Sequence, residues 1–470
     1  MSFDLPGLVQ SRMGENYSLH QKYLNRTLVR VQQIIGFDKV YARAKGAYLY
    51  DREDNEYLDF LSGFGVFAIG RNHPVPQKAI RDALDMDLPN MVQMDSALLS
   101  GLLAEALVKR FAAQGASHLD AVFLCNSGTE AVEGAIKFAR AGTGRSRLLS
   151  LQNSFHGLSM GSLSLTGNPF FHDGFAPFLP DCRAIPLGDL SALEKELQNR
   201  DVAALVIEPV QGKGVQFPKD DYFLQAQALC RRYGTLLVCD EVQTGLGRTG
   251  RWFAYEHWGL EPDIVTLAKA LSAGYVPCGA FVTRRSIYQK VFNRLDRCIV
   301  HSSTFGRNNL ACACGLAALS VLEEEGLVEN AARMGERLEQ GLIALQKEHE
   351  IVKEVRVKGL MMAVEFAEPQ SLRLKMAWKT VHALDPGLFP QLVVSRLMAK
   401  HRILTQVAAN NADVIKTLPP LIVGPKEIDY FLEALHSVLV DLRKFPGPLW
   451  DLGTNFVKAM RNGSEQPISA

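Results

Sequence analysis

Four sets of polar residues stand directly after short apolar runs in this chain of 470 residues. They are the stretch 126–129 (Asn-Ser-Gly-Thr), Glu208, the stretch 240–243 (Asp-Glu-Val-Gln) and Lys269. A lysine at the buried end of an apolar strand has its amine shifted toward the neutral form, and a neutral amine attacks an aldehyde. Lys269 is therefore a candidate nucleophile, although a surface lysine is the alternative when the residue is taken alone.

Asp240 ends the apolar run 235–239 (TLLVC), where a carboxylate is costly unless it meets a positive partner. A protonated pyridine nitrogen is such a partner, and an ionised Asp keeps that ring protonated so that it withdraws electrons from a carbanion. Glu241 and Gln243 add polar groups at the same strand end. A strand cap or a metal ligand is the alternative for the Asp-Glu pair alone.

Ser127, Gly128 and Thr129 open a predicted helix, where free amides and the positive end of the helix dipole form an anion site suited to a phosphate. An ordinary N-cap is the alternative. Phe155 follows the run RLLSL, where an aromatic face could cover a cofactor ring or simply pack in the core. Glu208 could orient a substrate or Gln243, or cap its strand.

Apolar runs alternate with helical patterns in the first two thirds of the chain. The runs are AVFLC from 121, RLLSL from 147, AALVIEPV from 203, TLLVCDEV from 235, DIVTLA from 263 and GAFVT from 279. The alternation predicts an α/β fold with a mainly parallel sheet covered by helices. Because ligands bind at the carboxyl ends of such strands, the four polar sets should meet at one site.

The pattern changes near residue 326 to long amphipathic helices followed by KEVRVKGLMMAVEF and VIKTLPPLIV. This predicts an N-terminal segment (1–75), a large cofactor-binding domain (76–325) and a smaller α+β C-terminal domain (326–470). Fifty-one Lys and Arg against 50 Asp and Glu leave a formal charge of +1, which favours small-molecule partners over nucleic acid.

Targeting and metal signals are not expected in this chain. The start MSFDLPGLVQ has neither a basic start nor an apolar run, and no stretch approaches roughly 20 apolar residues. We therefore expect no transmembrane segment and a cytoplasmic location, with eight reduced cysteines. The close pair Cys312 and Cys314 lacks the other ligands of a metal site and is expected in the core.

Residues 238–274, VCDEVQTGLGRTG and then DIVTLAKALSAG, resemble the pyridoxal-phosphate (PLP) attachment signature of class III aminotransferases, the family of ornithine and γ-aminobutyrate aminotransferases. Other stretches match the same family in the same order along nearly the whole chain: NSGTEAVEGAIKFAR, SFHG, IEPVQG, HSSTFGRN and LPPL. The resemblance implies a PLP-dependent transferase of fold type I, with a seven-stranded-type sheet in its large domain.

The resemblance also implies roles for single residues. Lys269 would carry the cofactor as a Schiff base and move a proton, Asp240 would pair with the pyridine nitrogen, and Gln243 would lie near the ring hydroxyl. The phosphate would be held at 127–129, with Phe155 and His156 beside the ring. Thr304 would reach the phosphate of the partner subunit's cofactor, so that a homodimer shares its active sites.

Three departures from the family pattern bear on the substrate. Lys416 stands where members acting on amino acids usually carry an Arg that grips a carboxylate, and a point charge replaces a bidentate fork. Lys213 stands where related members place a Glu that neutralises this Arg. Leu158 stands where many relatives have another Arg, so the distal pocket loses a carboxylate anchor.

Phe64, Val66 and Phe67 lie where relatives line the substrate entrance, and they predict a large or hydrophobic substrate. The combination of QGKGV, FHGL, HRILTQVA and VIKTLPPL is similar to the hopanoid-biosynthesis type branch, whose members aminate the side chain of a triterpenoid lipid.

The expected reaction is transfer of an amino group from a donor such as glutamate to an aldehyde or ketone. Three other PLP-dependent activities occur on the same scaffold and are alternatives for this chain: those of a decarboxylase, an epimerase and an aminomutase. A non-catalytic protein that retains the fold is a further alternative.

Overall fold

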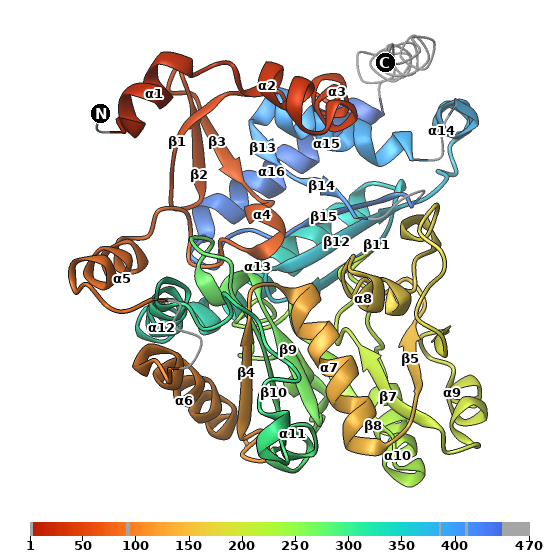
Figure 1. Cartoon of the computed structure of the whole chain (residues 1–470). Helices are drawn as coiled ribbons and strands as arrows, with labels where there is room; N and C mark the ends of the chain where they lie inside the picture. The colour runs from red at the N-terminus through yellow and green to blue at the C-terminus, as the bar shows by residue number, and fades with distance from the viewer. Residues whose placement is uncertain (1–2, 91–94, 385–386, 409–411, 444–470) are drawn as a thin grey trace.

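The largest sheet of the molecule has seven strands in the order β4-β10-β9-β8-β7-β5-β6 and lies in the lower half of Figure 1. The computed structural model describes residues 3–90, 95–384, 387–408 and 412–443. The strands of the sheet are β4 (Ala121–Cys125), β5 (Arg147–Leu151), β6 (Cys182–Ile185), β7 (Val202–Ile207), β8 (Leu236–Asp240), β9 (Ile264–Leu267) and β10 (Gly279–Thr283). Since only β10 runs against its neighbours, the predicted mainly parallel sheet is confirmed.

Two features of this sheet differ from the sequence prediction. Strand β6 lies at the edge of the sheet, beside β5 alone, and only its last residue, Ile185, is buried, so no apolar run marks it. Strand β10 is antiparallel because the chain returns from β9 through a short connection that holds only the 3-10 helix η3 (Lys269–Ser272). A parallel neighbour would need a longer crossover.

Apolar side chains cover both faces of the sheet. In β7, Ala204 and Val206 belong to the cluster that includes α7, whereas Leu205 and Ile207 belong to the larger cluster on the opposite face. This alternation follows from the two-residue period of a strand, and it explains why all six residues of β7 are buried. The helices around this sheet are α5 (Pro74–Asp85), α6 (Leu98–Ala113), α7 (Gly128–Thr143), α8 (Met160–Leu165), α9 (Leu190–Leu197), α10 (Tyr222–Tyr233), α11 (Arg285–Val291) and α12 (Asn309–Glu324).

A second, antiparallel sheet in the order β11-β12-β15-β14 follows in the C-terminal part. Its strands are β11 (Val352–Lys358), β12 (Met361–Phe366), β14 (Gln406–Val407) and β15 (Val414–Thr417). The helices of this part are α13 (Leu327–Glu348), α14 (Leu372–Leu384), α15 (Leu388–His401) and α16 (Pro425–Leu442). Strand β15 brings the buried Lys416 toward the large sheet.

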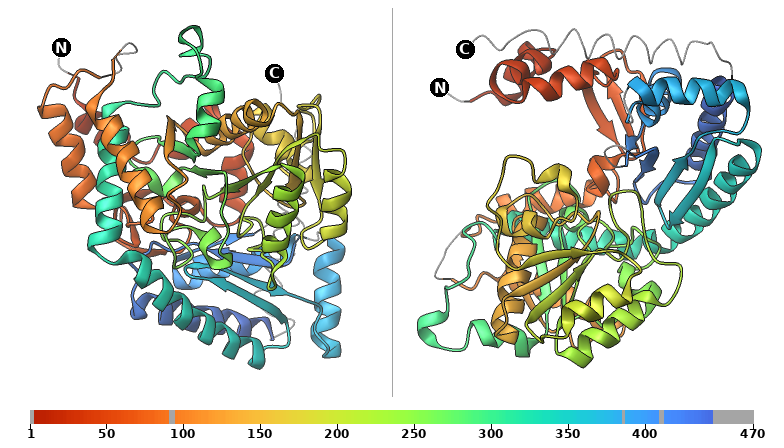
Figure 2. Two further views of the ribbon diagram at one scale, coloured as in Figure 1. Left: turned by 90° about the horizontal axis from the view of Figure 1, so that it is seen from below. Right: turned by 90° about the vertical axis from the view of Figure 1, so that its right-hand side faces the viewer.

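The N-terminal strands share a third sheet, in the order β1-β2-β3-β13, with a strand from the C-terminal part. Its strands are β1 (Tyr41–Lys45), β2 (Tyr48–Asp51), β3 (Glu56–Asp59) and β13 (Ile403–Leu404), and β13 is parallel to β3. The helices before and after these strands are α1 (Leu5–Arg12), α2 (Asn16–Tyr23), α3 (Arg26–Ile34) and α4 (Ser62–Gly65). Figure 2 shows this N-terminal region beside the C-terminal part and across from the large sheet. The division of the chain at 75 and 326 stays a prediction.

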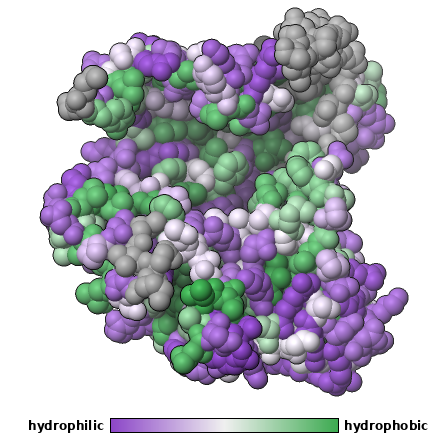
Figure 3. All heavy atoms as spheres, viewed as in Figure 1, coloured by the Kyte–Doolittle hydropathy of each residue, from purple (hydrophilic) through white to green (hydrophobic). Residues whose placement is uncertain are grey.

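Several apolar side chains are exposed to solvent on the surface of the single chain. Figure 3 shows a hollow, coloured by apolar residues, between the part that holds the N-terminal helices and the part that holds the large sheet. On α1 and α3, the side chains of Leu5, Leu8, Leu28 and Val31 are exposed. Among the described residues, no helix is long and apolar enough to cross a membrane.

Candidate active site

The start of α7 forms the anion-binding side of the pocket. Ser127 is the N-cap of this helix, and its Oγ accepts a hydrogen bond from the backbone amide of Glu130 at 3.3 Å. A Cβ on Gly128 would lie 2.7 Å from Val242 Cγ1, so only glycine lets the helix start approach the loop after β8. Because the first amides of a helix have no intrahelical partner, this end attracts a negative group.

The hydroxyl of Thr129 belongs to a polar cluster. Its Oγ1 lies 2.6 Å from both Ser159 Oγ and Ser162 Oγ, and Ser159 Oγ donates to Glu133 at 2.5 Å. The capping role, which was the alternative for this stretch, is present, and it is compatible with an anion at the first helix amides. Because Ser127 Oγ only accepts in the cap, its hydroxyl proton and the first helix amides remain as donors for a phosphate.

Asp240 lies buried at the carboxyl end of β8 and is held from three sides. Its Oδ2 accepts from His156 Nδ1 at 2.7 Å, and its Oδ1 accepts from Thr266 Oγ1 at 2.9 Å and from the amide of Val242 at 3.1 Å. Burial alone would lower the pKa of His156, but the hydrogen bond and charge of Asp240 raise it, with a further contribution from Glu208. The imidazole therefore fixes the carboxylate in one orientation.

Lys269 follows β9 and begins η3 with a left-handed backbone (φ 46°). Residues other than glycine adopt this backbone conformation at an energetic cost, and contacts with the surrounding structure must offset that cost. Burial lowers the pKa of Lys269, and the charges of Asp240 and Glu208 oppose this shift. A lowered pKa increases the fraction of neutral amine, the form that attacks a carbonyl carbon.

Glu208, just after β7, ties two loops of the pocket together. Its Oε1 accepts from the amide of Phe155 at 2.8 Å, and its Oε2 accepts from the amide of Gly212 at 2.7 Å. Burial raises the pKa of Glu208, with a contribution from Asp240, whereas His156 and the two amides oppose the shift. Glu208 thus acts as a cap that places the ring of Phe155 at the pocket.

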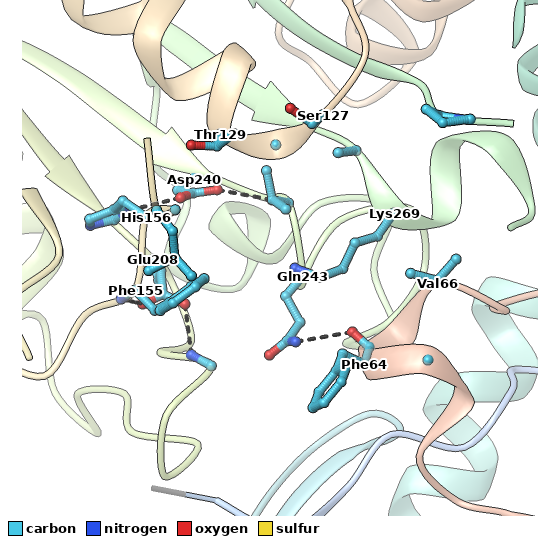
Figure 4. Close-up of a pocket in the computed structure, with 18 of the residues that line it drawn as sticks. Phe64, Val66, Ser127, Thr129, Phe155, His156, Glu208, Asp240, Gln243 and Lys269 are labelled. Carbon is cyan, nitrogen blue, oxygen red and sulfur yellow. Dashed lines mark hydrogen bonds and ion pairs between the residues drawn. The ribbon is translucent and has the colours of Figure 1, made fainter. Parts of the chain in front are cut away.

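Gln243 joins three parts of the chain, as Figure 4 shows in part. Its Nε2 donates to the carbonyl of Phe64 at 3.0 Å, and its Oε1 accepts from Lys416 Nζ at 3.0 Å. Lys416 Nζ also donates to the carbonyl of Gly212 at 2.6 Å. The amide of Gln243 is therefore fixed by the N-terminal segment on one side and by the C-terminal sheet on the other.

The pocket has a volume of about 750 Å³ and collects most of the predicted residues. Its lining includes these predicted residues: Phe64, Val66, Ser127, Gly128, Thr129, Phe155, His156, Leu158, Glu208, Lys213, Asp240, Gln243, Lys269 and Lys416. Phe67 is not among them, because its ring packs against the guanidinium of Arg71 and beside Gly63 and Gly274. Thr304 is exposed and also lies outside this pocket.

Several lining residues went unnoticed in the sequence. Tyr275, Val276 and Cys278 come soon after Lys269 in the chain, so their position next to the lysine run could have identified them. Phe171, at the end of the 3-10 helix η1 (Pro169–Phe171), and Gln406, on β14, are distant in sequence, and no local pattern marks them.

The fold and this site define a PLP-dependent transferase: an anion site, a carboxylate and a lysine meet at the carboxyl edge of a mainly parallel sheet. The class-III aminotransferase model matches residues 32–439, and the chain belongs to this family.

Named relatives agree with this family. The chain is 38% identical over 399 residues to an acetylornithine aminotransferase of Methanopyrus kandleri, covering 84% of this chain and 92% of the relative. It is 34% identical over 457 residues to the aminotransferase PigE of Serratia sp. (strain ATCC 39006), covering 91% of this chain. The chain spans about half of PigE, 53% of its length.

Solved structures show the same fold. An ornithine aminotransferase of Toxoplasma gondii has a TM-score of 0.80 at 28% identity, covering 94% of this chain and 99% of that one. An amine transaminase from an uncultivated Pseudomonas species, in a PLP-bound form, has a TM-score of 0.75 at 31% identity, covering 86% of this chain and 94% of that one.

The donor set of the pocket fits PLP, the cofactor of this family. The amides at the start of α7 would hold its phosphate, Asp240 its ring nitrogen and Phe155 one face of its ring. Lys269 would hold its aldehyde carbon. When bound, the cofactor supplies an electron-withdrawing ring that stabilises negative charge on the substrate carbon.

Proposed function

We propose that this chain transfers an amino group from a carboxylate-bearing donor, such as glutamate, to a large apolar aldehyde or ketone. The observation that carries the proposal is that the pocket is lined by both exposed apolar side chains and a buried cation. Phe64 and Leu158 are apolar and 54% and 57% exposed at the pocket, whereas Lys416 is buried in it. The apolar side chains suit an apolar substrate chain, and Lys416 suits an anion.

The donor's carboxylate would bind near Lys416 and Lys213. Lys416 has three donors, of which two reach Gly212 and Gln243. Lys213 Nζ lies 5.1 Å from the ring centre of Phe171 and 5.6 Å from that of Phe155, in the same pocket. The charge of Lys213 acts on Lys416, and two ammonium groups that repel each other favour an anion between or beside them.

Binding of a carboxylate donor should weaken as pH rises through about 7. Burial, together with the charges of Lys213 and Lys269, lowers the pKa of Lys416 to about 7. Lys416 is therefore charged below this pH and neutral above it. We expect kcat/KM for glutamate to fall by about tenfold per pH unit on the alkaline side, since kcat/KM reports the free enzyme.

The matched comparison for this pH profile is an amine donor without a carboxylate. The ratio of the two kcat/KM values removes the titration of Lys269, which serves both donors. In Lys416→Met the ratio should become independent of pH, and in Lys416→Arg it should favour glutamate over the whole range. A ratio that is flat in the wild-type enzyme would exclude Lys416 from the donor site.

The acceptor would lie along the apolar side of the pocket, where Leu158 replaces the Arg of many relatives. Leu158→Arg should therefore shift the preference from apolar aldehydes to carboxylate-bearing acceptors, by at least about tenfold in the ratio of kcat/KM values. Met160→Arg is the matched control, because Met160 is exposed nearby and does not line the pocket. If both variants keep the wild-type ratio, Leu158 has no part in acceptor choice.

Lys269 would act as the general base that takes a proton from the donor carbon and returns one to the acceptor carbon. Its lowered pKa suits this role, because efficient proton transfer requires a pKa near the working pH. The polar network around Asp240, Gln243 and Glu208 would hold the ring and the loops still during this transfer.

A homodimer with shared active sites is part of the proposal. Thr304 would reach the site of the partner subunit, and the segment of chain that leads to it exposes apolar side chains: Leu295 is 96% exposed, Ile299 70% and Phe305 58%. Such exposure is typical of a surface that a partner covers.

The eight cysteines are free thiols, which accords with the cytoplasm as the compartment.

A screen of amino donors and carbonyl acceptors, including lipid-derived aldehydes, tests this function. Product analysis should find a new amine and the keto acid of the donor in equal amounts. Release of carbon dioxide, or isomerised substrate without a new amine, would instead identify a decarboxylase, epimerase or aminomutase.

A further inference from the structure

Two imidazoles and a carboxylate meet at the C-terminal end of α13, and none of them lines the pocket. Glu348 ends α13, His349 follows as its C-cap, and His436 lies on the neighbouring α16. His349 Nε2 lies 3.1 Å from His436 Nδ1. Glu348 Oε1 lies 3.7 Å from His349 Nε2, and Glu348 Oε2 lies 3.6 Å from His436 Nδ1.

We propose that Glu348, His349 and His436 bind a divalent transition-metal ion of the zinc type. Two imidazole nitrogens and one carboxylate form a donor set that suits zinc. With bonds of about 2.0–2.1 Å, a tetrahedral ion holds its ligand atoms roughly 3.3 Å apart. The three distances of 3.1, 3.6 and 3.7 Å are close to this spacing, so small side-chain rotations would accommodate the ion.

The three ligands combine a fixed side with an open side. His349 is 1% exposed and meets His436 edge to face, with ring centres 5.1 Å apart, so its orientation is set by packing. The side chains of Glu348 and His436 are 51% and 41% exposed, which leaves a route for the ion and a fourth position for water. The negative end of the α13 dipole also favours a cation here.

Two features limit the affinity of this site. Arg443 donates to the backbone carbonyl of Glu348 and brings a positive charge to the same helix end. Metal binding at His349 Nε2 requires the ring proton on Nδ1, which is buried without a partner among the described residues. Removing the Arg443 charge, as in Arg443→Gln, should therefore tighten metal binding.

The ion would connect α13 to α16, two helices that pack together in the C-terminal part. Neither helix supplies a residue to the pocket, so the site should stabilise the fold without entering the reaction. A ligand that binds only the folded protein raises its melting temperature.

The test uses the full-length, PLP-loaded, tag-free protein after treatment with EDTA. Calorimetric titration with zinc chloride should find one more zinc per chain in the wild type than in His436→Ala, and Glu348→Gln should weaken that zinc by about tenfold or more. His20→Ala, at an exposed histidine on α2, is the matched control and should bind as the wild type does.

Two further measurements accompany the titration. Cobalt should give the visible absorption of a tetrahedral site in the wild type and not in His436→Ala, and transaminase activity should stay the same in both. Unchanged melting in EDTA shows that the variant folds. If the wild type and His436→Ala take up the same number of zinc ions, or if neither takes up any, the proposal is wrong.

Discussion

Lys269→Ala is expected to abolish covalent attachment of the cofactor and to slow turnover by about 10⁴-fold or more. The residue would supply both the amine that holds the cofactor and the base that moves the proton. The two roles depend on the same buried amine, whose pKa is lowered by its surroundings. Two other lysines line the pocket among the described residues, but Lys213 lies further along the loop after β7 and Lys416 lies on β15 of the C-terminal sheet.

Single-turnover kinetics of the donor half-reaction measure this loss. Lys290→Ala is the matched control, since Lys290 is exposed on α11 and should leave the rate unchanged. A small added amine such as methylamine should restore part of the lost proton transfer in Lys269→Ala. A variant that keeps more than about a tenth of the wild-type rate would show that another group performs this step.

Asp240→Asn is expected to lower the rate of the same half-reaction by about 10²- to 10³-fold. Asn has the same size but no charge, so it would no longer stabilise a protonated ring nitrogen. The buried His156 would also lose the charge that raises its pKa. The protein should still fold, because the side-chain oxygen of Asn can accept a hydrogen bond from a group that now donates to Asp240.

The measurement compares Asp240→Asn with Asp54→Asn, in which an exposed carboxylate between β2 and β3 is neutralised. Only Asp240→Asn should slow the reaction. The cofactor bound to this variant should also differ from that of the wild type in its absorbance spectrum and in the pH dependence of that spectrum. A loss smaller than about fivefold in Asp240→Asn would mean that the ring does not need this carboxylate.

The large sheet was predictable because its central strands are buried on both faces and appear as short apolar runs. Strand β7 is fully buried and was found in this way, whereas the partly exposed edge strand β6 was not. The reversed direction of β10 depends on the path of the connection after β9, which no apolar pattern records. The pairing of β3 with the two-residue β13 joins distant segments and has no local signal.

The site was predictable to the extent that it stands at strand ends. Lys269, Asp240 and Glu208 end three strands of one sheet, so their meeting follows from the parallel arrangement. The contacts between His156 and Asp240, and between Gln243 and the carbonyl of Phe64, depend on how separate loops pack together. For the same reason the sequence grouped Phe67 with Phe64 and Val66, whereas in the structure Phe64 and Val66 line the pocket and Phe67 does not.

Borohydride reduction of the PLP-loaded protein, followed by peptide mapping, tests most directly that Lys269 carries the cofactor. Reduction fixes the bond between the cofactor and its lysine, and mass spectrometry then locates the modified residue. We predict a single modified peptide that contains Lys269. Stoichiometric modification of Lys213, Lys416 or any other lysine, with Lys269 unmodified, would contradict the assignment on which the proposed reaction depends.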